Sequence, residues 1–180
     1  MKKIPLFQTY LPPNTKKRLA EVIDSGWVGC GPETEKFEQE FGIKFGQKYC
    51  VATNSCTSAL HLALILAGVK KGDEVITPVF TCTATNVPIL YQGATPVFAD
   101  INPQTLNIDP DSIVENITKK TKAIVVVHWG GYAADMETIL QIAKKFNLKV
   151  IVDAAHALGA RYKGLDISHY GDFICYSFQA

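Results

Sequence analysis

Short apolar segments alternate with longer segments of helical character through most of the chain. Residues 122–129 (KAIVVVHW) and 149–155 (KVIVDAA) are almost wholly apolar, which is typical of strands buried on both faces. The segments between such strands carry helix start and stop signals. This alternation predicts an α/β fold, in which a mainly parallel mixed sheet is covered by helices on both faces, giving three α/β/α layers.

The boundaries of these elements follow from the apolar pattern and from glycine and proline. Strands are expected at residues 48–53, 73–78, 95–100, 122–129, 149–155 and 172–178. Helices are expected at residues 15–26, 33–45, 57–68, 110–118 and 134–147, and at 81–93 with an interruption near Pro88. Residues 160–164 (ARYKG) are expected to form a hairpin turn that leaves Lys163 in solvent.

Composition excludes several classes of function. The 180 residues carry a net charge of +1 without a basic stripe, so neither nucleic acid nor a membrane is expected as a partner. No apolar stretch is long enough to span a bilayer, and prolines break the N-terminal run, so no signal peptide is expected. The cysteines are odd in number and form no CxxC pair, which favours reduced thiols in a cytoplasm over a disulfide framework or a metal site.

The residues after the strands indicate the kind of ligand, because ligands of such sheets bind beyond the carboxyl ends of the strands. Asn54–Ser58 (NSCTS) opens a helix with small polar side chains, which can cap the helix or direct backbone N–H groups at an anion. Both G-x-G-x-x-G and G-x-x-x-x-G-K-[ST] are absent. A single phosphate therefore fits this loop better than a dinucleotide or a nucleoside triphosphate.

Asp153, at the end of an apolar strand, needs a positive or hydrogen-bonded partner. A pyridinium nitrogen would serve, and the carboxylate would keep that ring protonated and electron-accepting; capping of the following turn is the alternative. His156 could touch the same ring or pack in the core. Ser177 could add a hydroxyl to the phosphate or simply end the last strand.

At this point the sequence resembles the DegT/DnrJ/StrS family of pyridoxal 5'-phosphate (PLP)-dependent sugar aminotransferases. The resemblance covers about residues 7–180, and the segments that carry it are GWVGCGPETEKFEQEF, NSCTSALHLAL, GDEVITPVFTCTATNVPILYQGATPVFADI, TKAIVVVHWGGYAADM, VIVDAAHALGARYKG and GDFICYSF. It implies the large domain of PLP fold type I. Residues 1–30 would then form an N-terminal arm and loop, and residues 31–180 an incomplete PLP-binding domain without its C-terminal part and small domain.

The resemblance also implies roles for individual residues. Asp153 would pair with the pyridine nitrogen, and His156 would lie near the ring hydroxyl. The family has an aromatic ring stacked on the cofactor at the position of Cys82, a role that Phe80 could take here, and commonly a glycine at the position of Cys56. The cofactor-binding residues would be Ser55, Cys56, Thr57, Cys82, Asp153, His156 and Ser177. The substrate-binding residues would be Trp27, Gly29 and Trp129, whose alternative places are a helix-linking loop for the first two and the core for the third.

By the same resemblance, the reactive lysine lies five places after Ser177, at position 182, beyond the printed sequence. The chain is therefore expected to be an N-terminal fragment that contains no catalytic lysine and is inactive alone. Lys163 is expected to be a solvated turn residue rather than the group that bonds to the cofactor.

The complete protein is expected to transfer an amino group, from glutamate, to a keto group of a nucleotide-linked sugar. Its place would be the biosynthesis of surface polysaccharide or of secondary-metabolite sugars, as a cytoplasmic homodimer. Three alternatives stay open from the sequence. They are a sugar dehydratase of the same family with histidine at position 182, a non-catalytic PLP-binding module, and a plain nucleotide-binding module.

Overall fold

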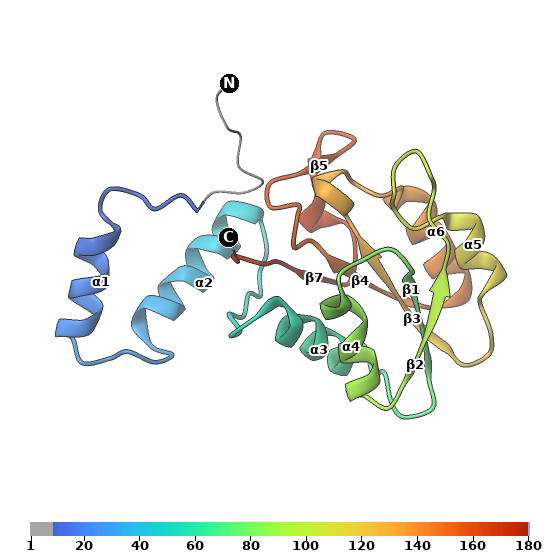
Figure 1. The fold of residues 1–180 in the computed structure, drawn as a ribbon, viewed down its shortest axis with the longest axis horizontal. Coiled ribbons are helices and arrows are strands. Elements are labelled where there is room, and N and C mark those ends of the chain that lie inside the picture. The colour runs from blue at the N-terminus through green and yellow to red at the C-terminus, as the bar shows by residue number, and fades with distance from the viewer. Residues whose placement is uncertain (1–8, 180) are drawn as a thin grey trace, which may run out of the picture. The chain divides into compact units, whose positions relative to one another are not determined.

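The computed structural model describes residues 9–179, which form two compact units (Figure 1). The larger unit is Thr53–Ser177, and the smaller comprises the described residues up to Ala52 together with Phe178 and Gln179. The division into an arm (1–30) and a large domain (31–180) stays a prediction, and residues 1–8 of that arm lie outside the described residues.

The larger unit is built on a five-stranded sheet in which each neighbouring pair of strands is parallel. The strands, in the order in which they lie side by side, are β2 (Thr95–Ala99), β1 (Glu74–Pro78), β3 (Thr121–Val127), β4 (Lys149–Asp153) and β7 (Phe173–Cys175). A separate two-stranded hairpin is formed by β5 (Arg161–Tyr162) and β6 (Leu165–Asp166). Lys163 lies exposed in its turn and pairs with Glu137, so the hairpin turn and the solvated lysine are both confirmed.

Helices cover both faces of this sheet (Figure 1). They are α3 (Cys56–Leu66), α4 (Thr83–Tyr91), α5 (Pro110–Glu115) and α6 (Met136–Phe146), with short 3₁₀ turns at Trp129–Gly131 and Ile167–His169. Helix α6 begins where the Asp135 carboxylate accepts the Thr138 N–H, and it ends at Asn147, which adopts a left-handed conformation.

Alternation along β3 separates two apolar cores. Ala123 and Val125 face the core formed with α3 and α4, whereas Ile124 and Val126 face the core formed with α5 and α6. Residues 123–127 of β3 are at most 6% exposed, which explains why this segment reads as a continuous apolar run. The predicted three-layer α/β/α architecture is confirmed.

Several of the predicted bounds are wrong, and the largest differences lie at residues 48–53, at Pro88 and in the last strand. Residues 48–53 form no strand; there the Ala52 N–H donates to Glu38 Oε1 at 2.7 Å, and no strand is described in the smaller unit to pair with them. Helix α4 runs through Pro88 without interruption, because the proline removes only its own N–H bond to the preceding turn. Strand β7 ends at Cys175 because its partner β4 ends at Asp153.

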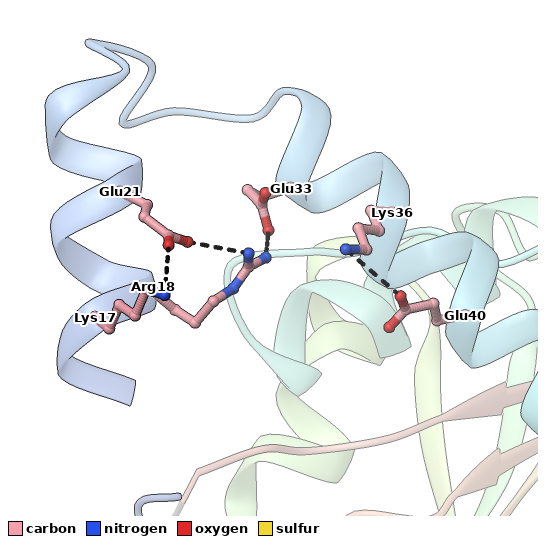
Figure 2. A network of polar contacts seen from close by, with 6 residues as sticks. All are labelled: Lys17, Arg18, Glu21, Glu33, Lys36 and Glu40. Carbon is pink, nitrogen blue, oxygen red and sulfur yellow. Dashed lines mark hydrogen bonds and ion pairs between the residues drawn. The ribbon is translucent and has the colours of Figure 1, made fainter. Parts of the chain in front are cut away.

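The smaller unit contains α1 (Thr15–Asp24) and α2 (Pro32–Phe45). Arg18 of α1 bonds to Glu21 of its own helix at 3.1 Å and to Glu33 of α2 at 2.6 Å, as Figure 2 shows. Both pairs are solvent-exposed, so each contributes at most about 1 kcal/mol. On α2, aromatic rings repeat at every fourth residue, and Phe178 meets two of them edge-on; the rings are Phe37, Phe41 and Phe45.

Within residues 9–179, no helix has both the length and the apolar character needed to cross a membrane. The same residues hold no cluster of three or more His, Cys, Asp or Glu side chains that could bind a metal ion.

Candidate functional site

The carboxyl ends of the parallel strands meet at one edge of the sheet. Val127 of β3, Asp153 of β4 and Cys175 of β7 are aligned across neighbouring strands. The residues that follow them therefore emerge side by side, as expected for the ligand-binding edge of such a sheet. This edge gathers the predicted residues Asp153, His156 and Trp129, together with Ser177, which lies half-buried just after β7.

Asp153 is a buried carboxylate, 5% exposed. Its Oδ2 accepts the Thr85 hydroxyl at 2.7 Å, and its Oδ1 accepts the Ala155 N–H at 3.1 Å. The second bond is the turn cap that the sequence left open as an alternative. Among the ion pairs of the described residues, none involves Asp153. A carboxylate buried with only neutral donors is costly to desolvate, so the site favours a cationic ligand atom.

The loop before α3 is organised by its own side chains. Ser55 is the N-cap, and its Oγ accepts the Ser58 N–H at 3.2 Å. The Ser58 hydroxyl donates to Asn54 Oδ1 at 2.7 Å. Cys56 and Thr57 are the first two helical residues, whose N–H groups have no acceptor within a helix. The cap is confirmed, and it leaves the two following N–H groups available to an anion.

Cys56 links this helix start to Asp153. Burial, and secondarily the negative charge of Asp153, raise the pKa of the Cys56 thiol from 9.0 to about 12. Burial also raises the pKa of Cys175, with smaller contributions from Cys56 and Asp153. The three groups thus lie close enough to interact electrostatically, and both thiols stay neutral at physiological pH.

We expect Cys56 to resist alkylation in the folded chain. With its thiolate suppressed by a pKa of about 12, iodoacetamide at pH 8 should modify Cys56 about a hundredfold or more slowly than in the urea-unfolded chain. Peptide mass spectrometry after timed quenching measures both rates, and the exposed Cys82 serves as the accessible control. Equal rates for Cys56 in the two states would contradict the neutral, shielded thiol.

Three rings line the same edge and are called the aromatic row: Phe80, Trp129 and His156. The ring centroids of Phe80 and Trp129 lie 4.4 Å apart, and those of Trp129 and His156 lie 5.3 Å apart. His156 is further held by the Gly130 N–H, which donates to its Nδ1 at 3.3 Å. Cys82 lies exposed at the N-cap of α4 and brings no ring to this edge.

The loop that carries Trp129 is fixed by Asn107, a residue that the sequence reasoning missed. Asn107 is 3% exposed; its Oδ1 accepts the Trp129 N–H at 2.9 Å, and its Nδ2 donates to the Tyr132 carbonyl at 3.0 Å. Gly131 has a φ of +83°, and a Cβ there would lie 2.9 Å from the His156 carbonyl oxygen. The Gly-Gly pair after Trp129 was the available signal that this loop passes close to another backbone.

Thr81, Thr85 and His128 were also missed. Two threonines four residues apart at the start of the predicted helix were the only hint of a hydroxyl pair. His128 is fully buried, and its Nδ1 accepts the Ala134 N–H at 3.2 Å. Burial lowers the pKa of His128 to about 4, so its ring is neutral.

Trp27 and Gly29 lie in the smaller unit, where both are exposed, and their assignment to the substrate stays a prediction. The indole N–H of Trp27 donates to the Cys30 carbonyl at 2.8 Å. This bond stabilises the turn between α1 and α2, in agreement with the helix-linking alternative.

Comparison with known proteins assigns this chain to a family. Residues 11–180 match the model of the DegT/DnrJ/EryC1/StrS aminotransferase family. The spore coat polysaccharide biosynthesis protein SpsC of Bacillus subtilis is 47% identical over 164 residues, which are 91% of this chain and 42% of SpsC. GDP-perosamine synthase of Escherichia coli O157:H7 is 41% identical over 179 residues, which are 99% of this chain and 49% of that enzyme.

The fold has a solved counterpart that contains a cofactor. NtdA from Bacillus subtilis with bound cofactor PMP superimposes with a TM-score of 0.84 at 40% identity, over 88% of this chain and 36% of NtdA. The chain spans about half the length, or less, of the curated relatives that it matches. The resemblance and the α/β fold expected from the sequence are both confirmed.

Proposed function

Because the chain belongs to the DegT/DnrJ/EryC1/StrS aminotransferase family, we propose that it forms the cofactor site of a PLP-dependent sugar aminotransferase. The complete protein transfers an amino group, with glutamate as donor, to a keto group of a nucleotide-linked sugar. It acts as a cytoplasmic homodimer in the biosynthesis of surface polysaccharide or of secondary-metabolite sugars. The observation that carries this proposal is the buried carboxylate of Asp153, which only neutral donors hold.

The residues at the carboxyl edge fit PLP chemically. When bound, PLP carries the amino group between donor and acceptor and withdraws electrons from the reacting carbon. Asp153 offers the negative charge that a protonated ring nitrogen requires. The start of α3 offers the N–H groups of Cys56 and Thr57 to a phosphate, and the Cys56 thiol, neutral below a pKa of about 12, adds no charge that would repel the dianion.

The remaining roles follow from position at the same edge. His156 is held by Gly130 and packs against Trp129, so its ring can orient a hydroxyl of the cofactor. Ser177, just after β7, supplies a hydroxyl to the phosphate. Trp129 contacts the substrate, and the family resemblance assigns the same role to Trp27 and Gly29. A lysine at position 182 would move a proton at the substrate carbon.

Binding of pyridoxamine phosphate (PMP) tests this function, because PMP has no aldehyde and needs no lysine to bind. Calorimetric titration of the chain is expected to show one PMP site and no comparable binding of NAD⁺. Pyridoxamine without its phosphate, as a matched control, should bind more weakly because the α3 terminus then has no anion. Absence of PMP binding, or tighter binding of NAD⁺, would remove the proposal.

Sequencing the gene through codon 182 separates an aminotransferase, with lysine there, from a dehydratase with histidine.

Cys82 brings no ring to the edge, so the aromatic row is expected to pack against the bound cofactor. Truncating Phe80 or Trp129 to leucine should raise the Kd of PMP roughly twofold to tenfold, since an aromatic contact is worth about 0.5–1.5 kcal/mol beyond its area. Fluorescence provides a second measurement: with Trp27→Phe, Trp129 is the remaining tryptophan, and PMP should quench its emission. Phe98→Leu is the control, because Phe98 is an exposed ring on edge strand β2. An unchanged Kd and unquenched emission would assign the row to packing alone.

A further inference from the structure

Two threonines of the α4 region form a directed chain of hydroxyls that ends on Asp153. The Thr85 Oγ1 lies 2.7 Å from Asp153 Oδ2 and 2.7 Å from the Thr81 Oγ1. A carboxylate only accepts, and a threonine hydroxyl has a single proton to donate. Thr85 must therefore give its proton to Asp153, so Thr81 must give its own to Thr85. The order Thr81→Thr85→Asp153 is therefore fixed by the donors and acceptors that are present.

This chain holds the carboxylate from one side while the backbone holds it from the other. The Ala155 N–H bonds to Oδ1 at 3.1 Å, and Thr85 bonds to Oδ2. With one bond to each oxygen, rotation of the carboxylate about its terminal bond is prevented. Thr85 is 1% exposed and Asp153 is 5% exposed, so water does not replace these donors easily. The lone pairs that remain on the two oxygens point in a direction set by protein atoms.

We propose that Thr85 is a positioning residue for the cofactor, which sets the orientation of Asp153 toward a protonated ring nitrogen and is itself polarised by Thr81. This inference rests on the proposed function, because it needs a ring cation beside Asp153. Thr85 acts through Asp153 and is not a catalytic residue. Its hydroxyl donates a hydrogen bond to the carboxylate and so fixes the direction in which the remaining lone pairs face the ring.

The fold supplies a matched control in a second buried threonine that bonds to the same helix. Thr77 of β1 is fully buried, and its hydroxyl donates to Asn86 Oδ1 of α4 at 2.6 Å. Thr77→Val and Thr85→Val each replace one buried hydroxyl with a methyl group. The first removes the bond to Asn86, and the second removes the bonds to Thr81 and Asp153. Only Thr85→Val removes a bond to Asp153. A purely structural role for Thr85 predicts that the two variants differ little in their effect on the ligand.

The experiment measures PMP labelled with ¹⁵N at the ring nitrogen, bound to the 180-residue chain. Calorimetry gives the Kd, and the ¹⁵N chemical shift across a pH series reports whether the bound ring carries its proton. Thr85→Val is expected to raise the Kd roughly tenfold to a hundredfold, the range for a hydrogen bond to a charged group, and to lower the pH at which the ring loses its proton. Thr85→Ser should restore both within about threefold, because it retains the hydroxyl. Thr77→Val should change neither.

The possible results distinguish a failure of the positioning role of Thr85 from a failure of the proposed function. If the unmodified chain binds PMP with a protonated ring and Thr85→Val does the same with equal Kd, the positioning role is wrong and the function stands. If the unmodified chain does not bind PMP, both are overturned. Should Thr85→Val fail to fold, Thr81→Val replaces it, since Thr81 is only half-buried and lies one bond farther out. That variant should lower the ring's titration pH by a smaller amount, and no change in it would again overturn the role.

Discussion

Asp153→Asn is expected to raise the Kd of PMP roughly 30-fold to several thousandfold. The substitution keeps the shape of the side chain and removes its charge, and loss of one partner from a buried charge pair costs about 2–5 kcal/mol. Isothermal titration calorimetry at pH 7.5 gives the Kd, and a thermal melt shows how much stability the amide costs. The amide has one accepting oxygen for the two donors, Thr85 and Ala155, so some loss of stability is expected even without ligand.

The control for this variant is the same substitution at Asp172. That aspartate also accepts a backbone N–H, from Val150 at 2.8 Å, but it precedes β7 and therefore lies at the opposite edge of the sheet. Asp172→Asn should leave PMP binding unchanged. If Asp153→Asn binds PMP as tightly as the unmodified chain, the ring nitrogen has another partner and the cofactor assignment fails.

Acid is expected to destabilise the fold through His128. Burial lowers the pKa of His128 from 6.5 to about 4. Between pH 6.5 and 4, the imidazole of His128 is therefore protonated in the unfolded chain but neutral in the folded chain. The stabilisation is complete above pH 6.5 and is lost as the pH falls toward 4, by about 3 kcal/mol in total at 1.36 kcal/mol per pKa unit. Protonation would place a hydrogen on Nδ1, the atom that accepts the Ala134 N–H, and so would also break that bond.

Urea unfolding at a series of pH values between 7.5 and 4 measures this loss. His128→Asn keeps an acceptor near the position of Nδ1 but cannot titrate, so its unfolding free energy should fall less steeply over the same interval. His169→Asn is the matched control, because His169 is exposed, and it should retain the steep decline. Parallel curves for the unmodified chain and His128→Asn would show that His128 does not drive acid unfolding.

The apolar pattern predicted the sheet well because buried parallel strands leave little choice of residue. Strand β3 is the clearest case: its side chains alternate between two cores, and both cores accept only apolar groups. The pattern failed at residues 48–53, where the same kind of residues occur without a neighbouring strand. Propensity describes a segment, whereas a strand also requires a partner, which the local sequence does not reveal.

The candidate site was likewise only partly predictable from the sequence. Asp153 could be predicted because a carboxylate that ends an apolar run is costly without a partner. Its actual donor, Thr85, lies 68 residues away along the chain, and a threonine on a predicted helix carries no sign of such a contact. The aromatic row was equally hidden, because its members follow three different strands and meet only when those strands align. Chemistry at strand ends is therefore visible in the sequence, and the groups that orient it are not.

The separation of the two cores from the carboxyl edge affects how this protein can diversify. None of the three rings in the aromatic row belongs to either core cluster. A substitution in that row therefore opens no cavity in either core, and the surface at this edge can change at little cost in stability. Gly131 sets the limit on this freedom: any side chain there meets the His156 carbonyl, so the loop can change its composition but not its path.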